Sequence, residues 1–227
     1  MFSKRSLFLL IVIATQMVAV SSFWGCAGKS VDENDPAAMM ADAEEDIKSD
    51  HYQIALEKLR TVKNKFPYSK YSSEALLRIS DVYFMQESYG EAALSYESFK
   101  DLHPKHEKVP YAMYRMSKSY YNDMPSSVHR DLSSGKKAED AYSEFLKRFP
   151  NAPEAAEARR DLKDARNRLA LKEMDVAEFY MHWNSYRSAR ARFKKLLEMY
   201  PDCDVATSAQ NRLVDAEKRI AETNTAR

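Results

Sequence analysis

Residues 73–104 set the pattern of this chain: apolar side chains recur every three or four positions in two stretches, with a polar break at residues 86–88 between them. That spacing places the apolar side chains of each stretch on one face of an α-helix. Neither stretch could bury its apolar stripe alone. The two are therefore predicted to fold together as a helical hairpin that ends at Pro104.

The spacing of marked residues in the second stretch occurs at four places along the chain. A small residue follows the first marked position by three, and a proline follows it by fifteen. A small residue lets two helices approach closely, and a proline ends a helix because it lacks the amide donor. Four helical hairpins are therefore predicted. The marked residues are Tyr52, Ala55, Phe66 and Pro67; Tyr89, Ala92, His103 and Pro104; Gly135, Ala138, Phe149 and Pro150; and Tyr186, Ala189, Tyr200 and Pro201.

The repeated unit resembles the tetratricopeptide repeat, in which a tyrosine, a small residue and a proline mark the second helix at this spacing. The resemblance implies an all-α fold, a solenoid of about four to five helical hairpins. The repeats are expected at about residues 36–67, 73–104, 110–150 and 153–201, with a capping helix at residues 205–222.

The repeats are longer than the ~34 residues of the family unit. Successive marker prolines lie 37, 46 and 51 residues apart. In repeat 3 the extra residues are assigned to a long loop over residues 122–134. In repeat 4 the nearly continuous helical pattern over residues 153–182 predicts one long helix that links repeats 3 and 4.

The N-terminus carries the pattern of a signal peptide. Lys4 and Arg5 precede an apolar run over residues 7–20, which is too short to be a comfortable membrane span. Residues 1–25 are therefore predicted to be a secretory signal.

Gly25 and Cys26 resemble the end of a lipobox, the motif whose cysteine is lipidated in bacterial lipoproteins. The resemblance implies an acyl chain such as palmitate on Cys26 and, because Ala27 follows the cysteine, sorting to the outer membrane. The two residues before Gly25 are bulkier than this motif prefers. The alternative is an ordinary secretory signal cleaved nearby, which would leave Cys26 free. The polar residues 26–35 are expected to form a flexible tether.

Charge and composition argue against several classes of function. The 35 basic and 34 acidic side chains nearly cancel, which gives no electrostatic basis for binding nucleic acid. The four glycines form no phosphate-binding loop, and no catalytic spacing stands out, so neither an enzyme nor a cofactor is expected. His103 and His106 have no third ligand nearby, so no metal site is expected. Cys203 is interpreted as a bystander thiol, because its acidic neighbours would raise its pKa.

A narrower resemblance rests on the order of features over residues 36–220. A lipobox, successive repeats, a loop in the third repeat and a long helix into the fourth resemble the BamD family, the lipoprotein subunits of the outer-membrane β-barrel assembly machine. The matching stretches are Phe66 to Ser69, Pro110 to Tyr114, Arg130 and Asp131 in the loop, and positions from Arg166 to Pro201.

The resemblance implies a non-enzymatic scaffold, lipid-anchored at the periplasmic face of the cell outer membrane. Its C-terminal repeats would dock a periplasmic domain of the barrel-forming subunit, with Arg192, Trp183 and Tyr186 as candidate contacts. A guanidinium suits this role because it can bind a carboxylate with two hydrogen bonds. From the residues alone, Arg192 could instead lie on a solvated helix face. Where the family usually has Arg-Gly, this chain has Trp183 and Asn184.

The N-terminal repeats would receive unfolded outer-membrane proteins, and accessory lipoproteins could be further partners. Tyr83, Tyr111 and Tyr114 are the candidate groove residues, because tyrosine rings can stack on an extended, aromatic-rich segment. The alternative for Tyr83 is packing between helices. The alternative for the whole chain is another periplasmic tetratricopeptide-repeat adaptor that coordinates cell-envelope or division proteins; the long helix argues against it.

Overall fold

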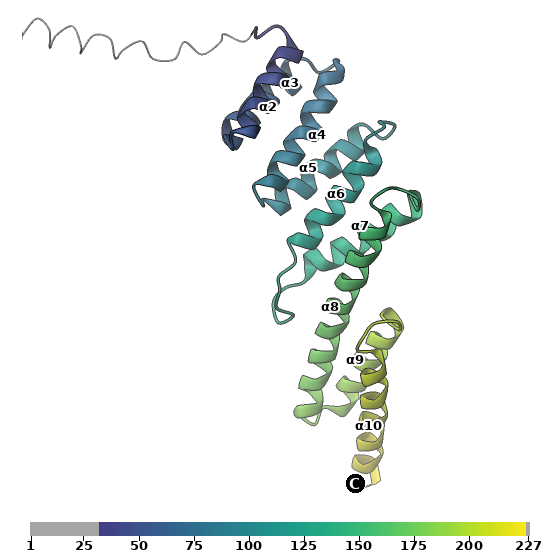
Figure 1. Cartoon of the computed structure of the whole chain (residues 1–227). Helices are drawn as coiled ribbons and strands as arrows, with labels where there is room; N and C mark the ends of the chain where they lie inside the picture. Colours follow the sequence, from purple (N-terminus) through teal and green to yellow (C-terminus); the bar gives the residue numbers. More distant parts are fainter. Residues whose placement is uncertain (1–31, 226–227) are drawn as a thin grey trace, which may run out of the picture.

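The computed structural model of the chain describes residues 32–225, which form nine helices and no strand (Figure 1). The expected all-α repeat solenoid is therefore confirmed. The predicted signal peptide, Cys26 and the first part of the predicted tether lie outside the described residues. The helices are α2 (Pro36–Lys48), α3 (Tyr52–Lys65), α4 (Lys70–Met85), α5 (Tyr89–Leu102), α6 (Val109–Asn122), α7 (Ser133–Arg148), α8 (Ala155–His182), α9 (Tyr186–Met199) and α10 (Ala206–Thr225).

The helices stack in chain order into an elongated solenoid (Figure 1). Each helix packs mainly against the next one in the sequence, so that α2–α3, α4–α5, α6–α7 and α8–α9 form hairpins. The first helices of neighbouring hairpins also touch, because α2 contacts α4 and α6 contacts α8. α10 follows the last hairpin and packs against α9 and α8.

Three of the hairpin turns use the same backbone device. Asp50, Glu87 and Asn184 each lie two residues before the first tyrosine of a second helix and have φ of 58°, 58° and 55°. This left-handed conformation suits glycine best and asparagine next. Asn184 suits this turn, because asparagine adopts the left-handed conformation more readily than most residues other than glycine. The Tyr186 hydroxyl also donates to Asn184 Oδ1 at 2.6 Å, which holds the turn.

The residue before each marker proline ends the second helix and packs its ring inward. In repeat 2 the ring centroid of His103 lies 5.5 Å from that of Phe99, and in repeat 3 Phe149 lies 6.1 Å from Phe145. Burial, with a smaller contribution from His106, lowers the pKa of His103. His103 therefore takes the packing role of the aromatic residues found at this position in the other repeats.

The long helix predicted to link repeats 3 and 4 is confirmed as α8, which runs for 28 residues. Its N-terminal part contributes Ala158 to the core of the middle repeats, where Tyr142 is fully buried. Its later part contributes Leu169 to the C-terminal core, together with Phe193 and Leu213. Because one continuous helix belongs to both cores, it fixes the orientation of the C-terminal repeats relative to the N-terminal ones.

The loop between α6 and α7 is packed against α8. Met124 and Leu132 are buried in the C-terminal core beside Leu169. Gly135 leaves room for Met124 in its present position, because a Cβ at residue 135 would lie 2.5 Å from Met124 Sδ and the methionine side chain would have to shift. A glycine therefore stands where the other three second helices begin with tyrosine. Two basic side chains of α8 also hold the loop by hydrogen bonds to its backbone. Arg168 donates to the carbonyl oxygen of Pro125, and Lys172 donates to the carbonyl oxygen of Arg130.

Candidate protein-binding surfaces

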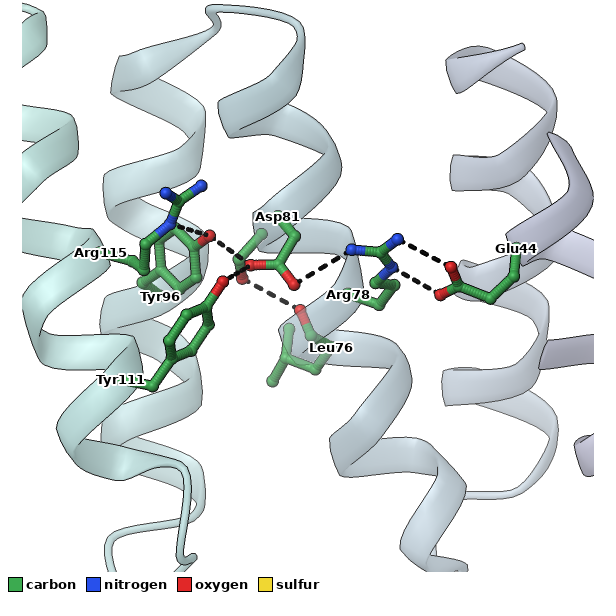
Figure 2. Close-up of polar contacts among 8 residues, drawn as sticks. Glu44, Leu76, Arg78, Asp81, Tyr96, Tyr111 and Arg115 are labelled. Carbon is green, nitrogen blue, oxygen red and sulfur yellow. Dashed lines mark hydrogen bonds and ion pairs between the residues drawn. The ribbon is translucent and has the colours of Figure 1, made fainter. Parts of the chain in front are cut away.

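The first helices of the N-terminal repeats carry a polar network that runs across three of them (Figure 2). Arg78 of α4 binds Glu44 of α2 through one edge of its guanidinium: Nε donates to Oε1 at 2.5 Å, and Nη2 donates to Oε2 at 2.7 Å. Such a two-pronged pair is stronger and more directional than a single contact. Arg78 therefore ties repeat 2 to repeat 1.

Asp81 is the centre of this network and is only 8% exposed. Its Oδ1 accepts hydrogen bonds from the hydroxyls of Tyr96 at 2.6 Å and Tyr111 at 2.8 Å. Its Oδ2 lies 3.4 Å from Nη1 of Arg78. Burial, together with the charge of Asp81, raises the pKa of Tyr111 to about 12, so this phenol stays protonated and donates at neutral pH.

The three predicted groove tyrosines do not form one exposed aromatic row. Tyr111 is half-buried and turns its hydroxyl to Asp81. Tyr114 is 6% exposed, and its ring centroid lies 5.9 Å from that of Phe145. Tyr83 is half-buried and accepts a hydrogen bond from Arg60 of α3 at 2.6 Å. Of the three, Tyr111 is the one that borders the polar network.

A hollow of about 310 Å³ lies beside the network, between α2, α4 and the turn that precedes α6. Leu77 and Met40 supply its apolar lining, and Arg78, Asp81 and His106 are among its polar residues. A hollow with mixed lining is suited to the side chain of an extended segment that crosses the first helices. From the sequence, only His106 among these five residues was singled out, as one member of a histidine pair.

The C-terminal end of α8 presents an exposed aromatic patch, which we define as Phe179 and Trp183. Their side chains are 58% and 65% exposed, and their ring centroids lie 6.2 Å apart. Tyr180 and His182 flank the patch, with ring centroids 5.7 Å from Phe179 and 6.0 Å from Trp183 respectively. Two large adjacent aromatic rings left in water are typical of a site that another protein covers.

The other two predicted contacts of the C-terminal repeats lie differently. Tyr186 follows the turn after α8 and is half-buried against the C-terminal core. Arg192 lies further along α9, where its Nη1 donates to Oε2 of Glu173 at 3.1 Å; its side chain is 39% exposed. Lys195 binds the other oxygen of Glu173 at 2.7 Å. The structure therefore keeps Trp183 at the surface, and it joins Arg192 to α8.

Glu173 gives the C-terminal repeats a contribution to stability that depends on pH. Burial alone would raise its pKa, but the pairs with Lys195 and Arg192 outweigh burial and lower it. A carboxylate with a lowered folded-state pKa stabilises the fold above its unfolded pKa of about 4.3, and this stability is lost as the pH falls through the folded value. Replacing Glu173→Gln should therefore lower the melting temperature at pH 7, and the gap to the wild type should narrow below about pH 4.3.

Thermal melts followed by circular dichroism between pH 7 and pH 3 would measure this narrowing. Glu144→Gln is the matched control, because Glu144 forms an exposed pair with Arg148 within one helix. Such exposed pairs contribute little to stability, so the melting temperature of this control should follow that of the wild type at all pH values. A gap for Glu173→Gln that stays constant down to pH 3 would contradict the prediction.

Two further properties concern the described residues alone. No helix over residues 32–225 combines the length and apolar character that crossing a membrane requires. Within the same residues, no group of three or more histidine, cysteine or acidic side chains is arranged to hold a metal ion. Cys203 is buried, and burial raises the pKa of its thiol, with Asp202 and Asp204 adding to the rise.

Comparison with known proteins identifies the family of this chain. The BamD outer membrane protein assembly factor of Vibrio cholerae is 25% identical over 219 residues, which cover 92% of this chain and 91% of that protein. The Caulobacter vibrioides BamD is 28% identical over 212 residues, which cover 91% of this chain and 69% of that protein. The Neisseria gonorrhoeae BamD is 28% identical over 171 residues, which cover 71% of this chain and 64% of that protein. The family described as "YfiO: Outer membrane lipoprotein" matches residues 32–227. The resemblance inferred from the repeats and their order is thus confirmed, and the chain belongs to the YfiO family of outer membrane lipoproteins.

Proposed function

We propose that this protein is a non-enzymatic scaffold of an outer-membrane β-barrel assembly machine. The observation that carries the proposal is the match of nearly the whole chain to outer membrane protein assembly factors. A rigid solenoid with separate surfaces on its N-terminal and C-terminal repeats suits a scaffold, because repeat proteins bind through extended faces. In this proposal a lipid on Cys26 holds the chain at the periplasmic face of the outer membrane.

The C-terminal repeats dock a periplasmic domain of the barrel-forming subunit, and the α8 aromatic patch is the centre of this contact. Tryptophan is the residue most enriched among the side chains that dominate binding energy at protein interfaces. Arg192 uses only Nη1 for Glu173 among the described residues, so its other nitrogens can meet a carboxylate of the subunit. Tyr186 supports the turn from which Trp183 projects.

The N-terminal repeats receive extended segments of unfolded outer-membrane proteins. The hollow beside the polar network supplies an apolar lining next to hydrogen-bonding groups, the combination that orients an extended chain. Tyr111 lies at the border of this surface, whereas Tyr83 and Tyr114 support it from between the helices.

The docking proposal predicts a large loss of binding when the α8 aromatic patch is removed. The double variant Phe179→Ala and Trp183→Ala should bind the purified periplasmic region of the barrel-forming subunit at least about 30-fold more weakly, which corresponds to about 2 kcal/mol. Its melting temperature should stay near that of the wild type, because both side chains are exposed. Biosensor titration of the full chain measures the affinity.

Leu102→Ala is the matched control, because Leu102 is 69% exposed on α5, and α5 lies far along the solenoid from the C-terminal end of α8. It should bind like the wild type. If the double variant also binds like the wild type, the α8 aromatic patch is not the docking surface. If a tagged full chain recovers only cell-wall or division proteins from detergent-solubilised membranes, the adaptor alternative replaces the assembly scaffold.

A further inference from the structure

Three arginines occupy the same place in the repeat. Arg78, Arg115 and Arg212 each lie eleven residues after a marker proline, on a first helix or on α10. Residues at equivalent repeat positions face equivalent neighbours, so their surroundings can be compared directly.

Arg78 and Arg212 are both saturated by carboxylates in the same way. Each binds a glutamate 34 residues earlier through Nε and Nη2, namely Glu44 for Arg78 and Glu178 for Arg212. Each also pairs with an aspartate three residues later, which is Asp81 at 3.4 Å and Asp215 at 3.0 Å. Two carboxylates therefore hold the guanidinium at these two positions.

Arg115 lacks both of these partners. The residue 34 positions earlier is Asp81, but its oxygens already accept the hydroxyls of Tyr96 and Tyr111 and the Nη1 of Arg78. The residue three positions later is Lys118, a cation that Asp161 holds at 2.7 Å. Over residues 32–225, no carboxylate forms an ion pair with Arg115.

The guanidinium of Arg115 is nevertheless fixed in place. Its Nε donates to the Tyr96 hydroxyl at 3.3 Å, and its carbon lies 3.6 Å from the ring centroid of Phe84. The same carbon lies 5.9 Å from the ring centroid of Tyr111. Figure 2 shows the two terminal nitrogens directed away from Asp81, and neither donates to another described residue. The charge of Asp81 reaches Arg115 only across the Tyr96 hydroxyl, which lies between them. A carboxylate in direct contact would bind such a half-buried cation more strongly, and a stacked guanidinium loses little entropy when a partner binds.

We propose that Arg115 is a receptor for the glutamate side chain of an extended polypeptide that crosses α4 and α6. Glu44 and Glu178 show within the molecule that a glutamate binds an arginine at this repeat position, although they use Nε and Nη2, and the Nε of Arg115 is taken by Tyr96. The two free nitrogens of Arg115 match the two oxygens of a carboxylate. The inference rests on the proposed reception of client segments by the N-terminal repeats and adds their chemistry: a client segment that carries an acidic side chain is preferred.

Three fluorescein-labelled synthetic peptides test the inference by fluorescence anisotropy with the full chain. All share the same alternating apolar and polar residues; one has a central glutamate and an amidated C-terminus, one has glutamine instead, and one has glutamine with a free C-terminal carboxylate. The glutamate peptide should bind about tenfold more tightly than either glutamine peptide. Arg115→Gln should remove this preference, whereas the matched control Arg212→Gln should keep it.

The possible failures are distinct from one another. Equal binding of the two amidated peptides to the wild type would overturn the carboxylate receptor and leave the proposed reception of client segments intact. Tighter binding of the peptide with the free C-terminus would overturn the assignment to a glutamate side chain. Binding of none of the peptides would overturn the inference together with client reception. If Arg115→Gln does not fold, the comparison of the three peptides on the wild type still decides.

Discussion

Asp81→Ala should lower the free energy of unfolding of the N-terminal repeats by about 3 kcal/mol, and the melting temperature by roughly 6–12 °C. The carboxylate is buried and accepts two phenol hydroxyls, from Tyr96 and Tyr111, in addition to its contact with Arg78. Alanine would leave both hydroxyls without an acceptor inside the repeat stack. The cost of an unsatisfied buried donor exceeds the net value of the bond that satisfied it. Thermal and urea denaturation followed by circular dichroism would measure the effect.

Two companion variants separate the network from the loss of charge. Asp81→Asn keeps an oxygen for the hydroxyls and should cost less than half as much as Asp81→Ala. Asp101→Ala removes an acidic side chain that is 65% exposed and lies 3.7 Å from Lys100, so it should be near neutral. A difference of 2 °C in melting temperature corresponds to about 1 kcal/mol or less in the free energy of unfolding. If the melting temperatures of Asp81→Ala and Asp101→Ala differ by less than this, the network does not hold the repeats together.

The fold could be predicted because its determinants are local in the sequence. Each hairpin needs an apolar stripe, a small residue at the helix crossing and a proline after the second helix, and all three lie within one repeat. The same locality allowed the long helix to be predicted, since α8 keeps its apolar spacing through Leu169 and Ala177 into the turn after His182. The packing role of His103 followed from its alignment with Phe66 and Phe149.

The candidate sites could be predicted only in part, because they depend on contacts between repeats. Both candidates are tyrosines on first helices, but their hydroxyls have different partners. The Tyr83 hydroxyl accepts from Arg60 of the preceding hairpin, and the Tyr111 hydroxyl donates to Asp81. Periodicity within one helix does not determine that choice. The surroundings of Arg192 could not be predicted for the same reason, since its ion pair with Glu173 joins two different helices, α9 and α8.

A signal for the polar network was nevertheless present in the sequence. Arg78, Arg115 and Arg212 share one offset from the marker prolines, and an acidic residue stands 34 positions before each of them: a glutamate for Arg78 and Arg212, and Asp81 for Arg115. A comparison of charges at equal repeat positions would have found these arginines, whereas a search for catalytic or metal-binding motifs passed over them. In a repeat protein, charges are therefore best compared between repeats.

The structure makes α8 the element on which the two proposed surfaces depend. Its first turns pack on the repeats that carry the polar network, and its last turn carries the α8 aromatic patch. In a solenoid each unit contacts only its neighbours, so a stiff helix shared by two cores is what couples them. If α8 is broken between the two cores, the N-terminal and C-terminal repeats should therefore unfold independently.

Leu171→Pro should therefore produce the largest effect of any single substitution at an exposed position. Leu171 is 43% exposed in the interior of α8. Proline there removes one backbone hydrogen bond and clashes with the carbonyl oxygen of residue 167, at a cost of about 3 kcal/mol or more. The C-terminal core should unfold first, so that urea denaturation followed by circular dichroism changes from one transition to two. Binding through the α8 aromatic patch should be lost together with the first transition.

Leu171→Ala is the matched control for this substitution. It removes the same exposed side chain and keeps the helical backbone, so its unfolding should stay within about 0.5 kcal/mol of the wild type. Limited proteolysis adds a second readout, because cleavage of Leu171→Pro should concentrate after residue 165 while the N-terminal repeats stay protected. A single unfolding transition at the wild-type midpoint would show that the continuity of α8 does not couple the two cores. The hairpin contacts of α7 with α8 and of α8 with α9 would then suffice to hold the repeats in register.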